Sequence, residues 1–226
     1  MEKRYIRNLN SISEDDMLVI RQSKILVVGC GGLGGYIIEL LLRLGVGSIT
    51  AIDADVFDET NLNRQLLSTM NTLGKRKCDV AKERALQINP DVAFNPISKR
   101  LSESNAQEFI HGHDVVMDAV DNVSTRLLLE KTCSEEGIPL IHGAIAGWFF
   151  QIGIVMPNDN LLQRIYSSKE EKGIETTLGN PSFTPAAAAS FQVAECIKLI
   201  LKKDLPLKSK LLYVDLLNNS YDILEL

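Results

Sequence analysis

Apolar residues along this chain recur in short blocks with two different spacings. Blocks of consecutive apolar residues rich in β-branched side chains indicate buried strands, and blocks with apolar residues every three or four positions indicate amphipathic helices. The first strand is predicted at 25–28, and the helix that follows it is predicted at 33–44. The same order repeats along the chain. Further strands are predicted at 49–53, 92–97, 115–119 and 140–141, and further helices at 77–88, 106–110 and 124–136.

This alternation of strand and helix is typical of an α/β fold with right-handed crossovers between parallel strands. After Gly143 the pattern changes to a strand at 148–155, a helix at 186–201 begun by Thr184 and Pro185, and a closing hairpin of strands at 211–215 and 221–226. We therefore predict one Rossmann-like domain spanning 1–226, with a mostly parallel central sheet flanked by helices and a C-terminal antiparallel extension. Its predicted parts are an N-terminal arm and a helix capped by Ser13 (1–22), a nucleotide-binding half (23–142), and a sheet-completing half (143–226) with a crossover loop at 157–183.

Composition narrows the classes of function. The 226 residues are 45% hydrophobic and carry a formal net charge of −5, and no long basic run suggests a nucleic-acid partner. No signal peptide is expected, and the apolar stretches are too short or too interrupted by charge to span a membrane. The four cysteines form no C-x-x-C pair, which favours a reducing compartment. We expect a soluble cytoplasmic protein.

Glycines between the first strand and the first helix predict a phosphate-binding turn. Gly29, Gly31 and Gly34 form G-x-G-x-x-G, which permits a tight turn and leaves N–H groups at the helix N-terminus free to face a phosphate. Asp53 ends the second strand at about the distance where an acid accepts hydrogen bonds from a ribose. The alternative for Asp53 is a solvated acid at a strand end. Taken only this far, the residues favour an NAD-dependent dehydrogenase.

Three charged residues favour a triphosphate instead. Arg64 lies in an asparagine-rich loop, Lys77 begins a helix, and Asp121 follows a strand at the edge where open α/β sheets bind ligands. Two cations and a carboxylate able to hold Mg²⁺ suit ATP better than the diphosphate of NAD. The alternatives are that Lys77 is an ordinary exposed helix residue and that Asp121 caps the helix after it.

Several motifs in a fixed order extend this pattern over nearly the whole chain. They are Arg4-Tyr5-x-Arg7, G-x-G-G-L-G at 29–34, Asp53-x-Asp55, Asn61-Leu62-Asn63-Arg64-Gln65, Gly74-x-x-Lys77, Ile88-Asn89-Pro90 and Asp121-Asn122. The set resembles the ThiF/MoeB/HesA family, adenylyltransferases that activate ubiquitin-like sulfur carriers and are related to ubiquitin-activating enzymes.

The resemblance implies that the C-terminal glycine carboxylate of a carrier ending in Gly-Gly attacks the α-phosphate of ATP, giving an acyl-adenylate and pyrophosphate. A carboxylate ionised at pH 7 needs no general base, so the reaction depends on neutralising charge. The implied catalytic residues are Arg64 and Lys77 on the phosphates, Asp121 on Mg²⁺, and Arg7, lent to the partner subunit of a homodimer. For Arg7 the alternative is a mobile arm side chain. The implied ATP-binding residues are Gly29, Gly31, Gly32, Gly34, Asp53, Asp55, Asn61, Arg64, Gln65, Lys77, Asp121 and Asn122.

The chain departs from many relatives in its cysteines. Leu-Gln-Arg-Ile at 162–165 replaces the first zinc-binding C-x-x-C pair, so no zinc is expected. Residues 157–185 contain no cysteine, so we expect an external sulfur donor instead of a covalent step there. Cys78 follows Lys77 near a helix start that lowers thiol pKa values, but a buried thiol is the preferred interpretation. His142, at the end of a buried strand, is interpreted as a hydrogen-bonded structural residue.

The sequence thus predicts a sulfur-carrier adenylyltransferase of thiamine or molybdopterin type. One alternative keeps the fold and ATP but takes a modified tRNA nucleoside, as in the tRNA dehydratase branch of the family. Another is a non-catalytic nucleotide-binding member, which the presence of Arg64, Lys77 and Asp121 argues against. The dehydrogenase ranks last, because no acid–base pair for hydride transfer accompanies the glycines.

Overall fold

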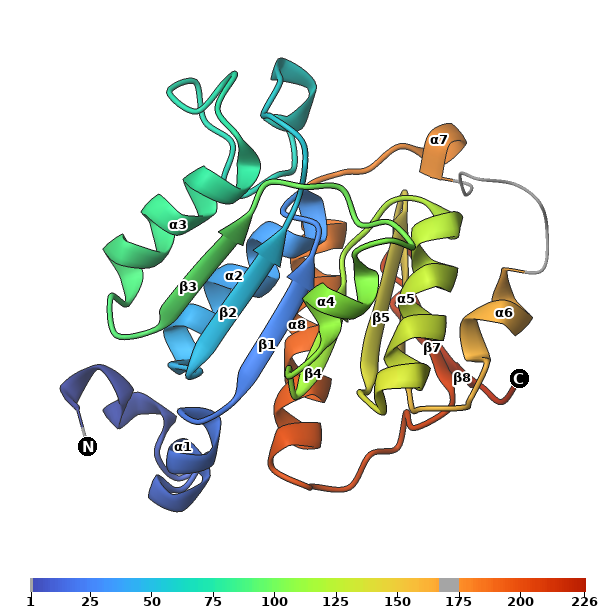
Figure 1. Cartoon of the computed structure of the whole chain (residues 1–226). Helices are drawn as coiled ribbons and strands as arrows, with labels where there is room; N and C mark the ends of the chain where they lie inside the picture. Colours follow the sequence, from blue (N-terminus) through green and yellow to red (C-terminus); the bar gives the residue numbers. More distant parts are fainter. Residues whose placement is uncertain (1, 167–174) are drawn as a thin grey trace.

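An eight-stranded sheet forms the centre of the computed structural model, which describes residues 2–166 and 175–226. Its strand order is β3-β2-β1-β4-β5-β6-β7-β8 (Figure 1). The strands from β3 to β5 pair in parallel, and β6, β7 and β8 are added antiparallel. This confirms the predicted Rossmann-like sheet with its antiparallel extension. The strands are β1 Lys24–Val28, β2 Ser48–Ile52, β3 Ala93–Ile97, β4 Val115–Asp118, β5 Leu140–Ala146, β6 Phe149–Val155, β7 Leu211–Asp215 and β8 Ser220–Leu224.

Helices cover both faces of this sheet (Figure 1). One hydrophobic core includes Ile38 of α2 and Ala188 of α8, and the core on the opposite face includes Leu129 of α5 and Leu161 of α6. Both cores are continuous with the buried β strands, so the sheet is enclosed between two helical layers. The helices are η1 Lys3–Asn8, α1 Glu14–Ile20, α2 Gly32–Leu44, η2 Glu59–Asn61, α3 Lys77–Ile88, α4 Ala106–Ile110, α5 Val123–Glu136, α6 Leu161–Ile165, α7 Glu175–Leu178 and α8 Phe183–Ile200.

The strand order reverses at β1, which lies between β2 and β4. Val28 at the end of β1 is in register with Ile52 at the end of β2 and with Asp118 at the end of β4. The turns that follow these three strands therefore meet at one edge of the sheet. Ligands of open α/β sheets bind at such a reversal point.

The N-terminal arm lies at the opposite end of the parallel strands, where β1, β2 and β3 begin (Figure 1). Its Tyr5 is buried, and the tyrosine hydroxyl accepts a hydrogen bond from Asn89 Nδ2 at 2.7 Å. The predicted cap of the next helix is confirmed: Ser13 Oγ accepts from the Asp16 N–H at 3.1 Å, and Asp16 Oδ2 accepts from the Ser13 N–H at 3.2 Å. This reciprocal arrangement is a capping box.

Two elements differ from the predicted ones because of contacts distant in sequence. β5 extends to Ala146, well beyond the predicted 140–141, because its whole length pairs with β6. It thereby crosses the predicted boundary between the two halves of the chain. Helix α8 begins at Phe183 instead of 186, and the Thr184 hydroxyl donates to Gly147 O at 2.6 Å instead of capping the helix.

The predicted crossover loop at 157–183 contains two short helices, α6 and α7. Residues 167–174 of that prediction lie outside the described residues. Among residues 2–166 and 175–226, no helix has the length and apolar character needed to cross a membrane.

Candidate nucleotide-binding site

The glycine turn between β1 and α2 is held tightly against the end of β4. Gly29 adopts φ +100°, and a Cβ built on it would lie 2.4 Å from the Ala119 carbonyl oxygen. A Cβ on Gly34 would lie 1.8 Å from the Gly29 carbonyl oxygen. No residue larger than glycine fits at these two positions without displacing backbone, which explains the two outer glycines of the motif.

The mouth of the turn is open. A Cβ on Gly31 or Gly32 would meet nothing closer than Gln65 Nε2 at 3.5 Å and Pro185 Cβ at 3.7 Å, respectively. The first N–H groups of a helix have no intrahelical partner, and Gly31, the N-cap of α2, provides no side chain to accept from them. This cradle fits the phosphates of a nucleotide.

Asp53 holds the turn from the neighbouring strand. Its Oδ2 accepts a hydrogen bond from the Cys30 N–H at 2.7 Å, and its Oδ1 accepts from the Asp55 N–H at 2.8 Å. Burial raises the pKa of Asp53. The structure thus places the predicted ribose acceptor at the floor of the turn, where it also has a structural role. Its contact with a ribose stays a prediction.

Lys77 is not an ordinary exposed helix residue. Its side chain is 9% exposed, and Nζ lies 3.3 Å from Asp55 Oδ2. Its backbone N–H donates to Asp55 O at 3.0 Å, which fixes the start of α3 beside the end of β2. The structure thus brings a buried cation to the loop that follows the site's second strand.

The loop around η2 contributes polar side chains at the same edge. Asn61 and Gln65 are buried, and Gln65 Oε1 has no hydrogen-bond partner among the described residues although its amide lies against Gly31. Arg64 donates to Thr60 O at 3.0 Å and to Asn63 Oδ1 at 2.9 Å. Gln65 therefore has spare hydrogen-bonding capacity at the glycine turn.

Asp58, in the same loop, is influenced by both predicted cations. Hydrogen bonds from Thr60 lower the pKa of this carboxylate, and the positive charges of Lys77 and Arg64 lower it further. Both cations therefore act on one carboxylate of this loop.

Asp121 follows β4 and is exposed. It does not cap α5, because the cap is Asn122, whose Oδ1 accepts from the Thr125 N–H at 2.9 Å. The Asp121 carboxylate lies 3.4 Å from Asn122 Nδ2. It thus stands two residues beyond Ala119, which packs on the glycine turn.

The chemistry of the single carboxylate of Asp121 is compatible with a magnesium ion that is bound mainly by a nucleotide. In the part of the chain that the structure describes, no three His, Cys, Asp or Glu side chains cluster closely enough to enclose a metal ion. Mg²⁺ commonly binds through one or two carboxylates together with substrate phosphates and water, and Asp121 offers such a carboxylate beside the cradle.

Arg7 is not brought to this site. It is exposed on η1, at the edge of the sheet where β1 begins, whereas the glycine turn follows the end of β1 (Figure 1). Within one subunit the arm and the cradle therefore lie at opposite ends of the parallel strands.

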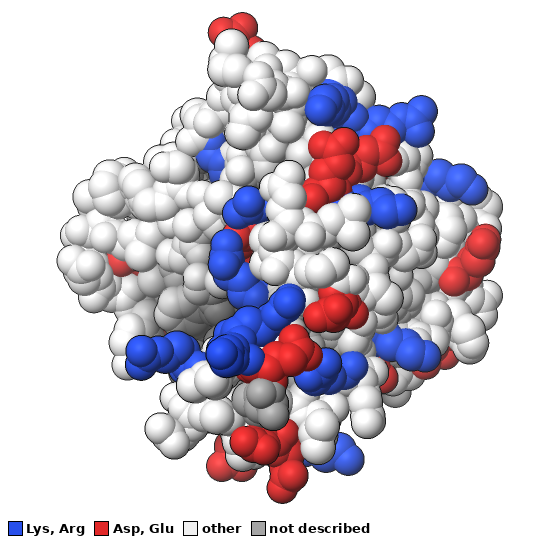
Figure 2. All heavy atoms as spheres, turned by 90° about the vertical axis from the view of Figure 1, so that its left-hand side faces the viewer, with Lys and Arg blue, Asp and Glu red and all other residues white. Residues whose placement is uncertain are grey.

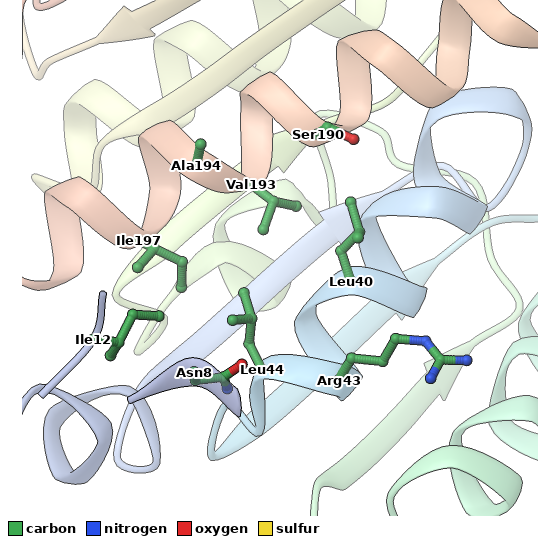
Figure 3. Close-up of a pocket in the computed structure, with 9 residues that line it drawn as sticks. All are labelled: Asn8, Ile12, Leu40, Arg43, Leu44, Ser190, Val193, Ala194 and Ile197. Atoms are coloured by element: carbon green, nitrogen blue, oxygen red, sulfur yellow. The ribbon is translucent and has the colours of Figure 1, made fainter. Parts of the chain in front are cut away.

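Beside the arm lies an apolar groove between α2 and α8, with a volume of about 460 Å³. Figure 3 shows Leu40 and Leu44 of α2 facing Val193 and Ile197 of α8 across this groove, with Arg43 at one end. The arm closes its lower end with Asn8 and Ile12 (Figure 3).

The cysteines are buried. Cys78 donates to backbone carbonyl oxygens such as Ala51 O at 3.4 Å, and its Sγ lies 3.7 Å from Cys30 Sγ. The interpretation of Cys78 as a buried thiol is confirmed. The segment 162–165 belongs to α6, whose Leu162 and Gln163 N–H groups donate to the Glu130 carboxylate.

One polar cluster was not assigned to the site from the sequence. Asp118, at the end of β4, is fully buried and accepts a hydrogen bond from His142 Nδ1 at 2.7 Å. Arg126 and Tyr166 complete the cluster, with Arg126 Nη1 donating to the tyrosine hydroxyl at 2.6 Å. The signal in the sequence was an aspartate ending an apolar strand. The interpretation of His142 as a hydrogen-bonded residue of a buried strand agrees with this contact.

Comparison with known proteins identifies relatives over almost the whole chain. The sequence profile described as the ThiF family matches residues 4–226. The chain is 33% identical over 224 residues to the SAMP-activating enzyme E1 of Haloferax volcanii, covering 97% of this chain and 83% of that protein. It is 31% identical over 201 residues to the molybdopterin-synthase adenylyltransferase of Salmonella typhimurium, covering 87% of this chain and 80% of that protein.

Two further likenesses carry less weight, one because it covers little more than half of the chain and the other because its sequence identity is low. The tRNA threonylcarbamoyladenosine dehydratase of Haemophilus influenzae is 40% identical over 128 residues, which cover 56% of this chain and 49% of that protein. Among solved structures, that of PaaA superimposes with a TM-score of 0.82 at 20% identity, covering 99% of this chain and 82% of that chain. The last likeness shows the fold alone.

Proposed function

The chain belongs to the ThiF family, and on that premise we propose that it is an ATP-dependent adenylyltransferase that activates the C-terminal glycine carboxylate of a small ubiquitin-like sulfur carrier. The names of the two relatives that cover most of the chain support this proposal. The structural observation that carries it is the open glycine turn. The turn packs on Ala119, two residues before Asp121, and the buried Lys77 is anchored on the same edge through Asp55.

The proposed reaction joins two anions. A carboxylate oxygen of the carrier attacks the α-phosphorus of ATP, the bond from that phosphorus to the bridging oxygen breaks, and pyrophosphate leaves with its electrons. The carboxylate is ionised at pH 7, so no residue has to remove a proton. The dominant requirement is to reduce the repulsion between the carboxylate and the phosphates.

The described residues supply that neutralisation. Lys77 and Arg64 would bind phosphate oxygens, and the N–H groups at the start of α2 would face them as well. Asp121 would hold Mg²⁺, which supplies further charge neutralisation when it is bound. Asp53 and Asn61 would position the nucleoside, and Gln65 would orient the phosphates with its unpaired oxygen.

The remaining assignments concern the pathway. The acyl-adenylate would pass to an external sulfur donor, since no cysteine occurs in 157–185. Thiamine- or molybdopterin-type sulfur transfer is the proposed setting. All four cysteines are free and buried, which is compatible with a cytoplasmic location.

We also propose a homodimer in which Arg7 serves the partner subunit's site. The exposed Arg7 lies far along the sheet from its own cradle, and the apolar groove beside its arm offers a surface for a second copy (Figure 3). Mixing two inactive variants tests this arrangement. If Arg7 acts across the dimer, Arg7→Ala combined with Asp121→Ala regains about a quarter of the activity, because random pairing creates one intact site in each mixed dimer. No recovery after verified subunit exchange would contradict the arrangement.

Pyrophosphate exchange tests the catalytic proposal. The purified chain is incubated with ATP, Mg²⁺, labelled pyrophosphate and carriers ending in Gly-Gly, with Asp121→Ala as the comparison. Carrier-dependent exchange that Asp121→Ala abolishes supports the proposal, whereas exchange that persists in Asp121→Ala contradicts the assignment of Asp121.

A tRNA-modifying dehydratase is the second candidate, favoured by the 40% identity of one stretch to such an enzyme. Against it stands the formal charge of −5. On the face shown in Figure 2, Lys and Arg side chains are interspersed with Asp and Glu instead of forming one basic field. Stimulation of ATP turnover by tRNA, without exchange on any carrier, would favour this candidate.

A further inference from the structure

The loop that carries Asp121 is held at the point where it leaves β4, by contacts from both faces of the sheet. From α8, Gln192 Nε2 donates to Asp118 O at 2.8 Å. On the opposite face, the Asp118 carboxylate is fully buried and accepts hydrogen bonds from His142 Nδ1 at 2.7 Å and from the Val120 N–H at 3.1 Å. The end of β4 is thus fixed through both its backbone and its side chain.

Arg126 joins this loop to the end of α6. Its Nη2 donates to Val120 O at 2.8 Å, and its Nη1 donates to the Tyr166 hydroxyl at 2.6 Å. The guanidinium also lies 5.3 Å from the centre of the Tyr166 ring. Val120, the residue directly before Asp121, therefore has its N–H bound by Asp118 and its carbonyl bound by Arg126.

Donor and acceptor rules fix the direction of each proton in the cluster. The Tyr166 oxygen accepts from Arg126 and from Gln151 Nε2 at 2.7 Å, so its own O–H is left for His142 Nε2 at 3.2 Å. Gln151 Nε2 also lies 3.2 Å from His142 Nε2, so this histidine nitrogen accepts in either case. His142 then carries its proton on Nδ1 and donates it to Asp118. Burial lowers the pKa of His142, which favours this neutral form. Tyr166 is thus linked to Asp118 through a satisfied chain of hydrogen bonds.

We propose that Tyr166, acting through Arg126 and His142, is a positioning residue that sets the Asp121 loop for Mg²⁺–ATP. Two paths of hydrogen bonds start at Tyr166, one through Arg126 and the other through His142 and Asp118. Both end on the backbone of Val120, one residue before Asp121. Tyr166 is the C-cap residue of α6, within the predicted crossover loop, so the position of that helix is coupled to the nucleotide site. The inference rests on the proposed function only through the role of Asp121.

A cluster that merely stabilises the fold would make a different prediction. Loss of such a cluster lowers stability and weakens ligand binding without regard to the metal. A positioning role acts through Asp121 and therefore affects the part of ATP affinity that Mg²⁺ supplies.

The test compares ATP affinity of the full chain in Mg²⁺ and in EDTA by titration calorimetry. Tyr166→Phe removes the hydroxyl and keeps the ring, and Tyr221→Phe on the exposed β8 is the matched control. The measured quantity is the ratio of the ATP affinity in Mg²⁺ to that in EDTA. We expect this ratio to be about 3- to 10-fold smaller in Tyr166→Phe than in the wild type, with the affinity in EDTA unchanged. Equal losses in Mg²⁺ and in EDTA would overturn the proposal, as would an effect of the same size in Tyr221→Phe.

A double-mutant cycle adds a second readout. Tyr166→Phe should cause no further loss of Mg²⁺-dependent affinity in an Asp121→Ala background, because its effect passes through Asp121. The same fractional loss in both backgrounds would overturn the proposal. If Tyr166→Phe does not fold, Arg126→Lys replaces it, since lysine keeps the charge and loses the two-pronged contact.

Nucleotide binding needs no carrier, so this test is separable from the proposed function. A chain that binds Mg²⁺–ATP but activates no carrier defeats the proposed function and leaves the cycle measurable. A wild-type chain whose ATP affinity does not respond to Mg²⁺ would overturn the positioning role itself.

Discussion

The Asp53 carboxylate accepts a hydrogen bond of 2.7 Å from the backbone N–H of Cys30. An acid at the end of β2 thereby fixes the glycine turn that follows β1, and the same acid holds the Asp55 N–H with its other oxygen at 2.8 Å. Both backbone contacts are hydrogen bonds to a charged acceptor, which are stronger than neutral ones. The geometry of the cradle consequently depends on a residue that is expected to contact the nucleotide too.

Asp53→Asn is expected to weaken ATP binding about tenfold, because an amide can replace only one of the two charged acceptors. Titration with ATP measures the effect, and Asp222→Asn on the exposed β8 is the control. Unchanged affinity in Asp53→Asn would show that the carboxylate is dispensable to the cradle.

Gly34→Ala and Gly31→Ala should separate folding from binding. A Cβ at 34 would meet the Gly29 carbonyl oxygen at 1.8 Å, so we expect a loss of about 3 kcal/mol in the free energy of unfolding. A Cβ at 31 has 3.5 Å to its nearest neighbour, so stability should hold while ATP affinity falls. Denaturant unfolding and ATP titration of both variants give the comparison. Equal stability of the two variants would contradict the described packing of the turn.

Lys77→Met should lower the exchange rate about 10²- to 10³-fold, because methionine keeps the buried stem and removes the charge proposed to bind a phosphate. Lys82→Met, an exposed position on the same helix α3, should leave the rate unchanged. Rates that fall together in both variants would indicate a general effect of charge.

Local motifs explain how much the sequence could predict. The glycine turn, Asp53 and Lys77 lie beside the ends of strands that apolar blocks reveal, so their common edge follows from parallel topology. The cluster of Tyr166 could not be predicted, because Tyr166 meets Arg126 from 40 residues away and no periodic pattern records that contact.

The same limitation applies to the start of α8. Its first turn is fixed by Thr184, which bonds Gly147 O from 37 residues away instead of forming a local cap. Capping rules describe neighbours in sequence, whereas this helix end is set by tertiary structure.

Glu39 provides a test of how α2 and α3 are joined. Its carboxylate binds Arg84 of α3 and Arg43 of α2. Burial alone raises the pKa of Glu39, but the two arginines outweigh it and hold the pKa below its ordinary value of 4.5. The stabilisation is therefore fully present above pH 4.5 and is lost as the pH falls through the lower folded-state pKa.

Glu39→Gln should accordingly cost about 1–3 kcal/mol of unfolding free energy at pH 7. The difference from wild type should stay constant down to about pH 4.5 and shrink below it. Urea unfolding across that range measures it, with the exposed Glu83→Gln as control. A difference that grows in acid would contradict the ion-pair assignment.

The most direct measurement of the central claim is the intact mass of the carrier. A Gly-Gly carrier is incubated with the chain, ATP and Mg²⁺ and then analysed without a sulfur donor, beside a carrier that lacks its last glycine. We predict that the full-length carrier gains the mass of an adenylate and that the truncated carrier does not. An unmodified full-length carrier, under conditions where the chain binds ATP, would contradict the proposed adenylyltransferase.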